Sequence, residues 1–180
     1  MSDPAPGSHR HHHRRAAPER VAAWIVTVSD TRTPETDTGG ARVAELLVGA
    51  GHAVVGREIV ADDAAAIAAA LRAALARDGV EAVILTGGTG VSPRDVTPEA
   101  VEPLLERVVP GFGELFRWLS YQEIGSAALL SRALAGLAGG RVVFVLPGSR
   151  GAVQLGMEKL ILPEVGHLLG EARKEPRMRS

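Results

Sequence analysis

The stretch VEAVILTGGTGVSPRDVTPEA, residues 80–100, contains both the strand and the turn around which we expect this chain to fold. Its first part is an almost continuous apolar run, typical of a central strand that helices cover on both faces. The turn that follows, residues 86–97, contains three glycines, a pattern most useful where the backbone needs positive φ or lies close to a ligand. The stretch therefore predicts either a ligand-binding turn or a plain, tight strand-to-helix connection.

The segments around this stretch alternate between strand and helix patterns. Strands are expected at residues 21–30, 52–60, 80–86 and 141–147. Helices are expected at residues 40–50, 64–79, 99–108, 112–125 and 126–138, and in two segments near the C-terminus. Thr97 offers an N-cap with Pro98 at the first helical position, whereas Gly51 and Gly79 are expected to end the first two helices.

This alternation predicts an α/β fold, a three-layer α/β/α domain around a largely parallel, doubly wound sheet. Such sheets bind ligands beyond the carboxyl ends of their strands, near the switch point in strand order. The residues that follow the expected strands should therefore converge on one crevice: Ser29, Asp30, Asp62, Asp63, Thr86, Gly87, Gly88, Thr89, Gly90, Ser92, Arg94, Asp95, Pro147, Gly148 and Ser149.

Composition bounds the domain organisation. The chain has 180 residues, 46% of them hydrophobic, which suits one sizeable core, so we expect a single domain at residues 19–172. Residues 1–18 lack apolar periodicity and predict a disordered tail, as do residues 173–180. The histidines of the first tail are either transition-metal ligands or a flexible, tag-like tract.

Charge and cysteine content exclude several function classes. The net charge is -1 and the body of the chain contains no basic run, so we expect neither nucleic acid nor an anionic membrane as a partner. The chain contains no cysteine, which excludes disulfides, thiolate metal ligands and a cysteine nucleophile. No apolar run approaches the roughly 18 residues of a membrane span, and the N-terminus lacks the apolar region of a signal peptide, so the predicted location is the cytoplasm.

The glycine turn is suited to a phosphate group. Glycine-rich turns expose backbone N–H groups, and the following helix would add the positive end of its dipole. The turn is neither a Walker A loop nor a GxGxxG fingerprint, so the glycine pattern alone does not name a ligand. Aspartates beside a phosphate would repel it unless a hard cation lay between them, so the pattern implies Mg²⁺.

Each polar residue also has a structural alternative. Asp62 or Asp63 could cap the helix at residues 64–79, and Asp30 could shape its own turn. Asp95 could form an ion pair with Arg94, and Ser149 could cap the helix that follows it.

Four segments carry a family resemblance. In this order and spacing, TGGTGVSPRDVTPEA, VPGFGELFR, SYQEIGSAALLSRALAG and VFVLPGS resemble the stand-alone molybdenum cofactor biosynthesis proteins of the MogA/MoaB group, the molybdopterin adenylyltransferases. The resemblance extends from about residue 21 to residue 169. The segment FRWLSYQEIGSA is most similar to the MoaB branch, whereas the intact PRDVTPEA is similar to the catalytically competent pattern.

The resemblance implies a Mg²⁺-dependent adenylyl transfer from ATP to molybdopterin, with pyrophosphate as the second product. It implies Asp62 and Asp95 as the catalytic pair that organises Mg²⁺, with Asp63 as the rival of Asp62. The turn formed by Gly87, Gly88, Thr89 and Gly90, with Ser92, would bind phosphate, and Thr86 and Arg94 would also contact the substrate or nucleotide. The remaining contacts to the pterin or adenosine portion would come from Ser29, Asp30, Pro147, Gly148 and Ser149, with Ser131 and Arg132 as further candidates.

Two other functions are compatible with the resemblance. The first is a non-catalytic oligomer of the MoaB type that holds a pterin or nucleotide and hands it on. The second is the related molybdenum insertase, but insertases resemble longer chains with additional domains and an altered loop, which this sequence lacks. The resemblance also allows the insertase as a downstream partner.

The segment VPGFGELFRWLSYQEIG, residues 109–125, predicts a homo-oligomer. Helical spacing places Phe112, Leu115, Phe116 and Leu119 on one core-facing side, with Trp118 and Tyr121 beside it. Tryptophan and tyrosine are favoured interface anchors, so we expect a partner on this second patch, unless packing within the monomer covers it. The family resemblance implies a homotrimer or a homohexamer.

Overall fold

The sheet is built from apolar runs whose alternate side chains enter two different cores. In the central strand β3 (Ala82–Thr86) all residues are buried. Ile84 packs into one hydrophobic cluster, whereas Val83 and Leu85 pack into the other. The strand is therefore covered on both faces, as its continuous apolar sequence predicted. The structure is a computed structural model that describes residues 18–174, so the predicted histidine tail and most of the C-terminal tail lie outside the described residues.

The sheet has six strands in the order β2-β1-β3-β6-β5-β4. The strands β2 (Ala53–Val60), β1 (Ala22–Val28), β3 and β6 (Arg141–Leu146) are parallel to one another. The strands β5 (Leu134–Ala138) and β4 (Arg107–Val108) complete the sheet through antiparallel pairs. From β1 the chain adds β2 on one side of the sheet and then β3 on the other side. The switch point in strand order therefore lies between β1 and β3, and the loops after these two strands meet there. The predicted α/β fold with a largely parallel sheet is confirmed.

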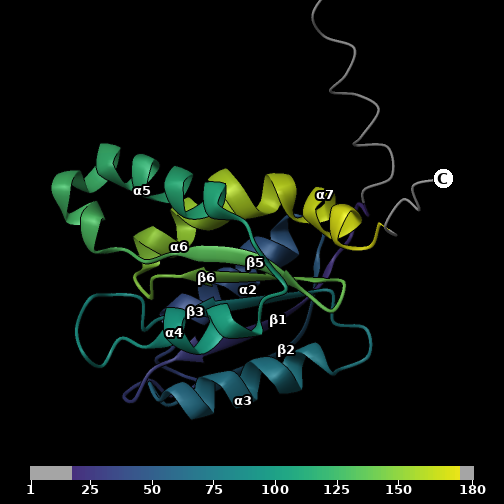
Figure 1. Cartoon of the computed structure of the whole chain (residues 1–180), viewed down its shortest axis with the longest axis horizontal. Coiled ribbons are helices and arrows are strands. Elements are labelled where there is room, and N and C mark those ends of the chain that lie inside the picture. Colours follow the sequence, from purple (N-terminus) through teal and green to yellow (C-terminus); the bar gives the residue numbers. More distant parts are fainter. Residues whose placement is uncertain (1–17, 175–180) are drawn as a thin grey trace, which may run out of the picture.

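Helices cover both faces of the sheet (Figure 1). The first face is covered by α2 (Thr38–Gly49), α5 (Pro110–Ile124), α6 (Arg150–Gly156) and α7 (Leu162–Ala172). The second face is covered by α3 (Ala64–Leu75) and the short α4 (Thr97–Val101). A π-helical turn, η4 (Met157–Ile161), joins α6 directly to α7. Among residues 18–174, no helix combines the length and the apolar character needed to cross a bilayer.

Two of the predicted helices are wrong in extent or type. The helix expected at residues 99–108 ends at Val101 and continues as the 3-10 turn η2 (Glu102–Leu104) before β4. The helix expected at residues 126–138 is instead the 3-10 helix η3 (Gly125–Leu130) followed by β5. The signal for a hairpin is the pair Gly139 and Gly140, which have φ of 56° and 70° and connect β5 to β6.

The helix α5 carries an apolar patch outside the core. Phe112 and Phe116 are buried, as predicted, and Phe112 packs on Phe144 with ring centroids 5.4 Å apart. Leu115 was predicted to face the core, and this prediction was wrong, because its side chain is 52% exposed. Leu115 lies three positions before the exposed Trp118, which places both residues on the same side of the helix. We call the exposed apolar side chains of this region the α5 patch: Leu115, Trp118, Tyr121, Ile124, Leu129 and Leu130.

The hairpin turn provides a test of the β5–β6 connection. We expect Gly139→Val to lower the free energy of unfolding by about 1–2 kcal/mol, because a β-branched residue is disfavoured at positive φ. Gly139→Asn is the matched control and should lose much less, since asparagine tolerates this conformation. Urea denaturation of both variants measures the difference, and equal losses would contradict the hairpin.

Candidate active site

The glycine turn after β3 is attached at its base by hydrogen bonds to the neighbouring strand and to α4. The Gly87 amide donates to the Leu146 carbonyl at 3.0 Å. The Thr97 hydroxyl donates to the Gly87 carbonyl at 2.9 Å, and the Thr97 amide donates to the Gly88 carbonyl at 3.0 Å. The prediction of Thr97 as the N-cap was therefore wrong by one residue: Val96 holds that position, and the hydroxyl closes the turn instead.

Two glycines of this turn are required by close approach to carboxylates. A Cβ on Gly88 would collide with the Thr97 hydroxyl and lie 2.8 Å from Oδ1 of Asp62. A Cβ on Gly90 would lie 2.7 Å from Oδ2 of Asp95. The turn is therefore a surface on which both predicted catalytic carboxylates pack directly.

The structure separates the two aspartates that precede α3. Asp63 is its N-cap, and its carboxylate accepts from the Ala66 amide at 2.9 Å. Asp62 instead lies against the glycine turn, and its buried Oδ1 has no hydrogen-bond partner among the described residues. Burial raises the pKa of the Asp62 carboxyl, and the carboxylates of Asp95 and Asp30 raise it further, whereas the Val96 amide and Arg94 lower it. The charged form of Asp62 is thus disfavoured in the folded protein by its own surroundings.

Asp30 connects the loop after β1 to the glycine turn. Its Oδ1 accepts from the Asp62 amide at 3.0 Å, and its Oδ2 forms an ion pair with Arg94. The alternative in which Arg94 pairs with Asp95 is therefore not what the structure shows. Asp95 accepts from the Ser92 amide at 3.0 Å and leaves its charge unpaired with any described basic side chain. Three carboxylates, those of Asp30, Asp62 and Asp95, act on one another while Arg94 neutralises one of them.

Two hollows lie beside these loops and share Gly148 and Ser149. The first, which we call the β1 hollow, measures about 380 Å³ and is lined by Thr27, Ser29, Arg32, Thr86, Gly148 and Ser149. The second, the α5 hollow, measures about 300 Å³ and is lined by Gly88, Gly90, Asp95, Phe116, Ser131 and Pro147. The first is lined mainly by polar side chains, whereas the second combines the glycine turn with apolar side chains of α5.

The serines of the β1 hollow also have local structural roles. The Ser29 hydroxyl accepts from the amides of Thr31 and Arg32, each at 3.2 Å, which forms a compact turn after β1. The Ser149 hydroxyl accepts from the Ala152 amide at 3.3 Å and caps α6, which was the structural alternative predicted for it. Both hydroxyls still line the hollow, so these contacts fix their positions without removing them from it.

Ser131 and Arg132 occupy different surroundings. The Ser131 hydroxyl is buried without a partner among residues 18–174, and this residue lines the α5 hollow. The Arg132 guanidinium is engaged by protein groups: Nε donates to the Gly90 carbonyl at 2.8 Å, and its other nitrogens contact the Asp95 carbonyl and the Glu99 carboxylate. Of the two, Ser131 is therefore the residue whose polar side-chain atom is not engaged by protein groups.

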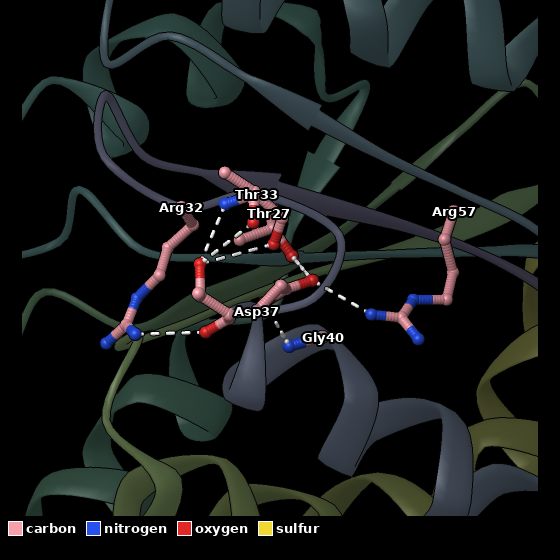
Figure 2. Close-up of polar contacts among 7 residues, drawn as sticks. Thr27, Arg32, Thr33, Asp37, Gly40 and Arg57 are labelled. Carbon is pink, nitrogen blue, oxygen red and sulfur yellow. Dashed lines mark hydrogen bonds and ion pairs between the residues drawn. The ribbon is translucent and has the colours of Figure 1, made fainter.

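A buried network at the start of α2 was not predicted from the sequence. Asp37 is the N-cap of α2 and is only 5% exposed. Its carboxylate accepts from the Thr27 hydroxyl, the Gly40 amide and Arg57, each at 2.9 Å (Figure 2). The sequence Asp37-Thr38-Gly39-Gly40 before an apolar helical pattern is an N-cap signal that could have identified it. The network holds α2 beside β1, and Thr27 and Asp37 both border the β1 hollow.

The donor set fits a divalent cation that is also held by a phosphate. The described residues contain no group of three or more histidine, cysteine, aspartate or glutamate side chains that could enclose a metal by themselves. Mg²⁺, however, is commonly held by one or two carboxylates together with substrate phosphates and water. The unpartnered Oδ1 of Asp62, destabilised by the Asp95 carboxylate, is the hard oxygen donor that such a site needs.

Comparison with known proteins identifies close relatives. Residues 24–167 match the family described as a probable molybdopterin binding domain. The chain is 52% identical over 164 residues to the molybdenum cofactor biosynthesis protein B of Bacillus anthracis, covering 91% of this chain and 97% of that protein.

Solved structures agree with this assignment. A crystal structure of a molybdenum cofactor biosynthesis protein B matches with a TM-score of 0.86 at 53% identity, over 88% of this chain and 99% of that one. The tungsten cofactor synthesizing protein MoaB from Pyrococcus furiosus matches with a TM-score of 0.79 at 39% identity, over 88% and 100% of the two chains. The predicted resemblance, including its MoaB branch, is confirmed.

The Asp37 network generates a stability prediction. Asp37→Ala should lower the free energy of unfolding by about 2–4 kcal/mol, because it removes a helix cap and leaves buried donors and part of the Arg57 charge without an acceptor. Asp63→Ala removes the exposed cap of α3 and should lose only about 1 kcal/mol. Urea denaturation measures both variants. Equal losses would mean that the Asp37 network adds nothing beyond an ordinary cap.

Proposed function

We propose that this chain, which belongs to the family of the probable molybdopterin binding domain, is a molybdopterin adenylyltransferase that uses ATP and Mg²⁺. Its place in molybdenum cofactor biosynthesis follows from that family and from relatives of about half identical sequence that carry this name. The finer assignment is ours. A single observation carries it: the unpartnered Oδ1 of Asp62 lies against the glycine turn. Asp62 belongs to a group of three carboxylates, with Asp30 and Asp95, whose negative charge Arg94 only partly neutralises.

In the proposed reaction the terminal phosphate of molybdopterin attacks the α-phosphorus of ATP. A new phosphorus–oxygen bond forms there, and the bond between the α-phosphorus and the bridging oxygen breaks, so pyrophosphate leaves with the electron pair. Phosphoryl chemistry of this kind depends on in-line placement and on neutralisation of charge more than on covalent help from the protein. A rigid turn with backbone amides can supply the placement, and its carboxylates would hold the cation that supplies the neutralisation.

The residues divide the work as follows. Asp62 and Asp95 would hold Mg²⁺ through their carboxylate oxygens, and the ion, when bound, neutralises phosphoryl oxygens. Gly88, Thr89 and Gly90 would orient the phosphates through their backbone amides and Ser92 through its hydroxyl, whereas the Gly87 amide is bonded to the Leu146 carbonyl and fixes the base of the turn. Because α4 has only five residues, the support expected from a helix dipole is small and the amides of the turn must do this. Ser29, Asp30, Pro147, Gly148 and Ser149 would contact the pterin or adenosine portion, since most of them line the hollows.

We further propose that residues 19–172 form one domain, that the protein acts in the cytoplasm, and that it assembles as a homotrimer or homohexamer. The α5 patch supports the assembly because it exposes several large apolar side chains on one helix and the turn after it, including Trp118 at 60% and Tyr121 at 62% exposure. Patches of this kind on soluble proteins usually mark interaction surfaces, and symmetric homo-oligomers are the commonest assemblies. The number of chains, three or six, is taken from the family resemblance. The downstream molybdenum insertase is the other proposed partner.

The adenylyl transfer can be tested directly. Purified protein incubated with molybdopterin, ATP and Mg²⁺ should form adenylylated molybdopterin, and a chelator should prevent it. Asp62→Asn and Asp95→Asn should each reduce turnover by about two orders of magnitude or more, since each removes charge that acts in the transition state.

Asp63→Asn is the matched control, because asparagine is an equally good N-cap for α3. Turnover of this variant should stay near the wild-type value. Absence of product from the wild-type protein, together with Mg²⁺-dependent ATP binding in calorimetry, would favour the non-catalytic holding function. Full turnover by the Asp95 variant would remove Asp95 from the site.

The assembly has its own test. Light scattering should give a mass near three or six chains, and Trp118→Glu should shift it toward smaller species because a charge would be placed in the apolar contact. Val48→Glu, at an exposed apolar position of α2 away from the α5 patch, should leave the mass unchanged. A wild-type protein that is monomeric at micromolar concentration contradicts the proposal.

A further inference from the structure

Arg132 lies between η3 and β5, outside the glycine turn, yet most of its polar contacts are made to that turn. Its backbone amide donates to the Thr89 carbonyl at 3.1 Å. Its Nε donates to the Gly90 carbonyl at 2.8 Å, and its Nη2 donates to the Asp95 carbonyl. One residue therefore contacts the loop at both ends of the segment 89–95.

The charge of Arg132 is balanced on the side away from the loop. Its Nη1 forms an ion pair with the Glu99 carboxylate, which lies in α4. The Arg132 hydrogen bond lowers the pKa of the Glu99 carboxyl, and the pair is charged at neutral pH. All three guanidinium nitrogens are thus directed at protein acceptors. A phosphate could recruit this side chain only by releasing the loop, which argues against a ligand-binding role.

The contact with the Asp95 carbonyl has a consequence on the other side of the peptide. A trans peptide unit places its C=O and N–H groups on opposite sides. The Asp95–Val96 peptide is held by Arg132 at its oxygen, and its N–H on the opposite side, that of Val96, lowers the pKa of the Asp62 carboxyl. A single planar unit therefore lies between the guanidinium and Asp62. Arg132 also holds the Gly90 carbonyl, through its Nε. Gly90 is the residue against which the Asp95 carboxylate packs.

We propose that Arg132 is a positioning residue that holds the 88–96 loop in the shape that orients the carboxylates of Asp62 and Asp95. It does so by binding the carbonyls of Gly90 and Asp95 together with one planar cation. Lysine cannot replace this function, because an ammonium on a flexible chain lacks the fixed fork of donors that bridges two carbonyls. The inference rests on the proposed function only for its effect on turnover.

The test measures the loop first and turnover second. Amide hydrogen exchange of the ligand-free protein should be faster in residues 88–96 of Arg132→Lys and Arg132→Met, on the order of tenfold, since hydrogen bonds to a charged group are lost. Exchange in α3, at residues 64–75, should stay at the wild-type rate and serves as the internal reference. Glu99→Gln removes only the outer ion pair and should leave loop exchange within about threefold of wild type.

Turnover then distinguishes positioning from general stability. Arg132→Lys should lower kcat by about tenfold or more and raise the Mg²⁺ concentration needed for half-maximal rate, with little change in melting temperature. Loop exchange unchanged in both Arg132 variants, or accelerated equally in α3, would overturn the proposal. Selective loop acceleration in a protein whose wild type shows no turnover would leave the positioning role standing and would count against the adenylyl transfer alone.

Discussion

The site depends on one steric constraint, the close packing of Gly88 against Asp62 and Thr97. A side chain at position 88 would collide with the Thr97 hydroxyl and approach Oδ1 of Asp62 to 2.8 Å. Because Gly88 has no Cβ, the end of β3, the start of α4 and the loop after β2 can meet at one point. The Thr97 hydroxyl and amide then bond to the Gly87 and Gly88 carbonyls, which closes the turn. This contact places Asp62, on the loop after β2, directly against the glycine turn.

The charge distribution around that contact lowers the stability of the folded protein. Asp62 is half-buried beside two other carboxylates, and its raised pKa means that its charged form destabilises the folded state. Between the ordinary and the raised pKa the native state binds more protons than the unfolded chain, so stability falls as pH rises through that interval. Asp37 shows the opposite arrangement, since its buried carboxylate is saturated by a hydroxyl, an amide and Arg57. The buried Asp37 and the half-buried Asp62 thus differ in their effect on stability, because the protein supplies hydrogen-bond partners for both carboxylate oxygens only at Asp37.

Much of this architecture can be predicted from the sequence, and each element or residue that was predicted wrongly has a specific physical cause. Short apolar and β-branched runs predicted β1, β2, β3 and β6 with their helices, because strands that pack on helices leave a strong local pattern. The strand β5 was missed because its alanines and leucines also suit a helix, and only its partner β6 and the Gly139–Gly140 turn make it a strand. The aspartates after the strands were located by topology, but which of Asp62 and Asp63 caps α3 is decided by backbone geometry that no residue pattern contains. The role of Asp37 was not predicted because it depends on Thr27 and Arg57, which are distant from it in the sequence.

The α5 patch and the α5 hollow share residues, so the proposed assembly would be linked to the proposed site. Ile124 and Leu130 are exposed members of the patch, and both also line the hollow that contains Gly90 and Asp95. Any surface that packs on the patch must therefore contact the outer wall of the hollow. Apolar side chains that are half in water would become fully buried there, which lowers the local dielectric and strengthens each charge interaction at the glycine turn. The same contact that removes apolar surface from solvent would then alter the electrostatics of Asp95, so the oligomeric state and the strength of cation binding at this edge of the sheet should be coupled.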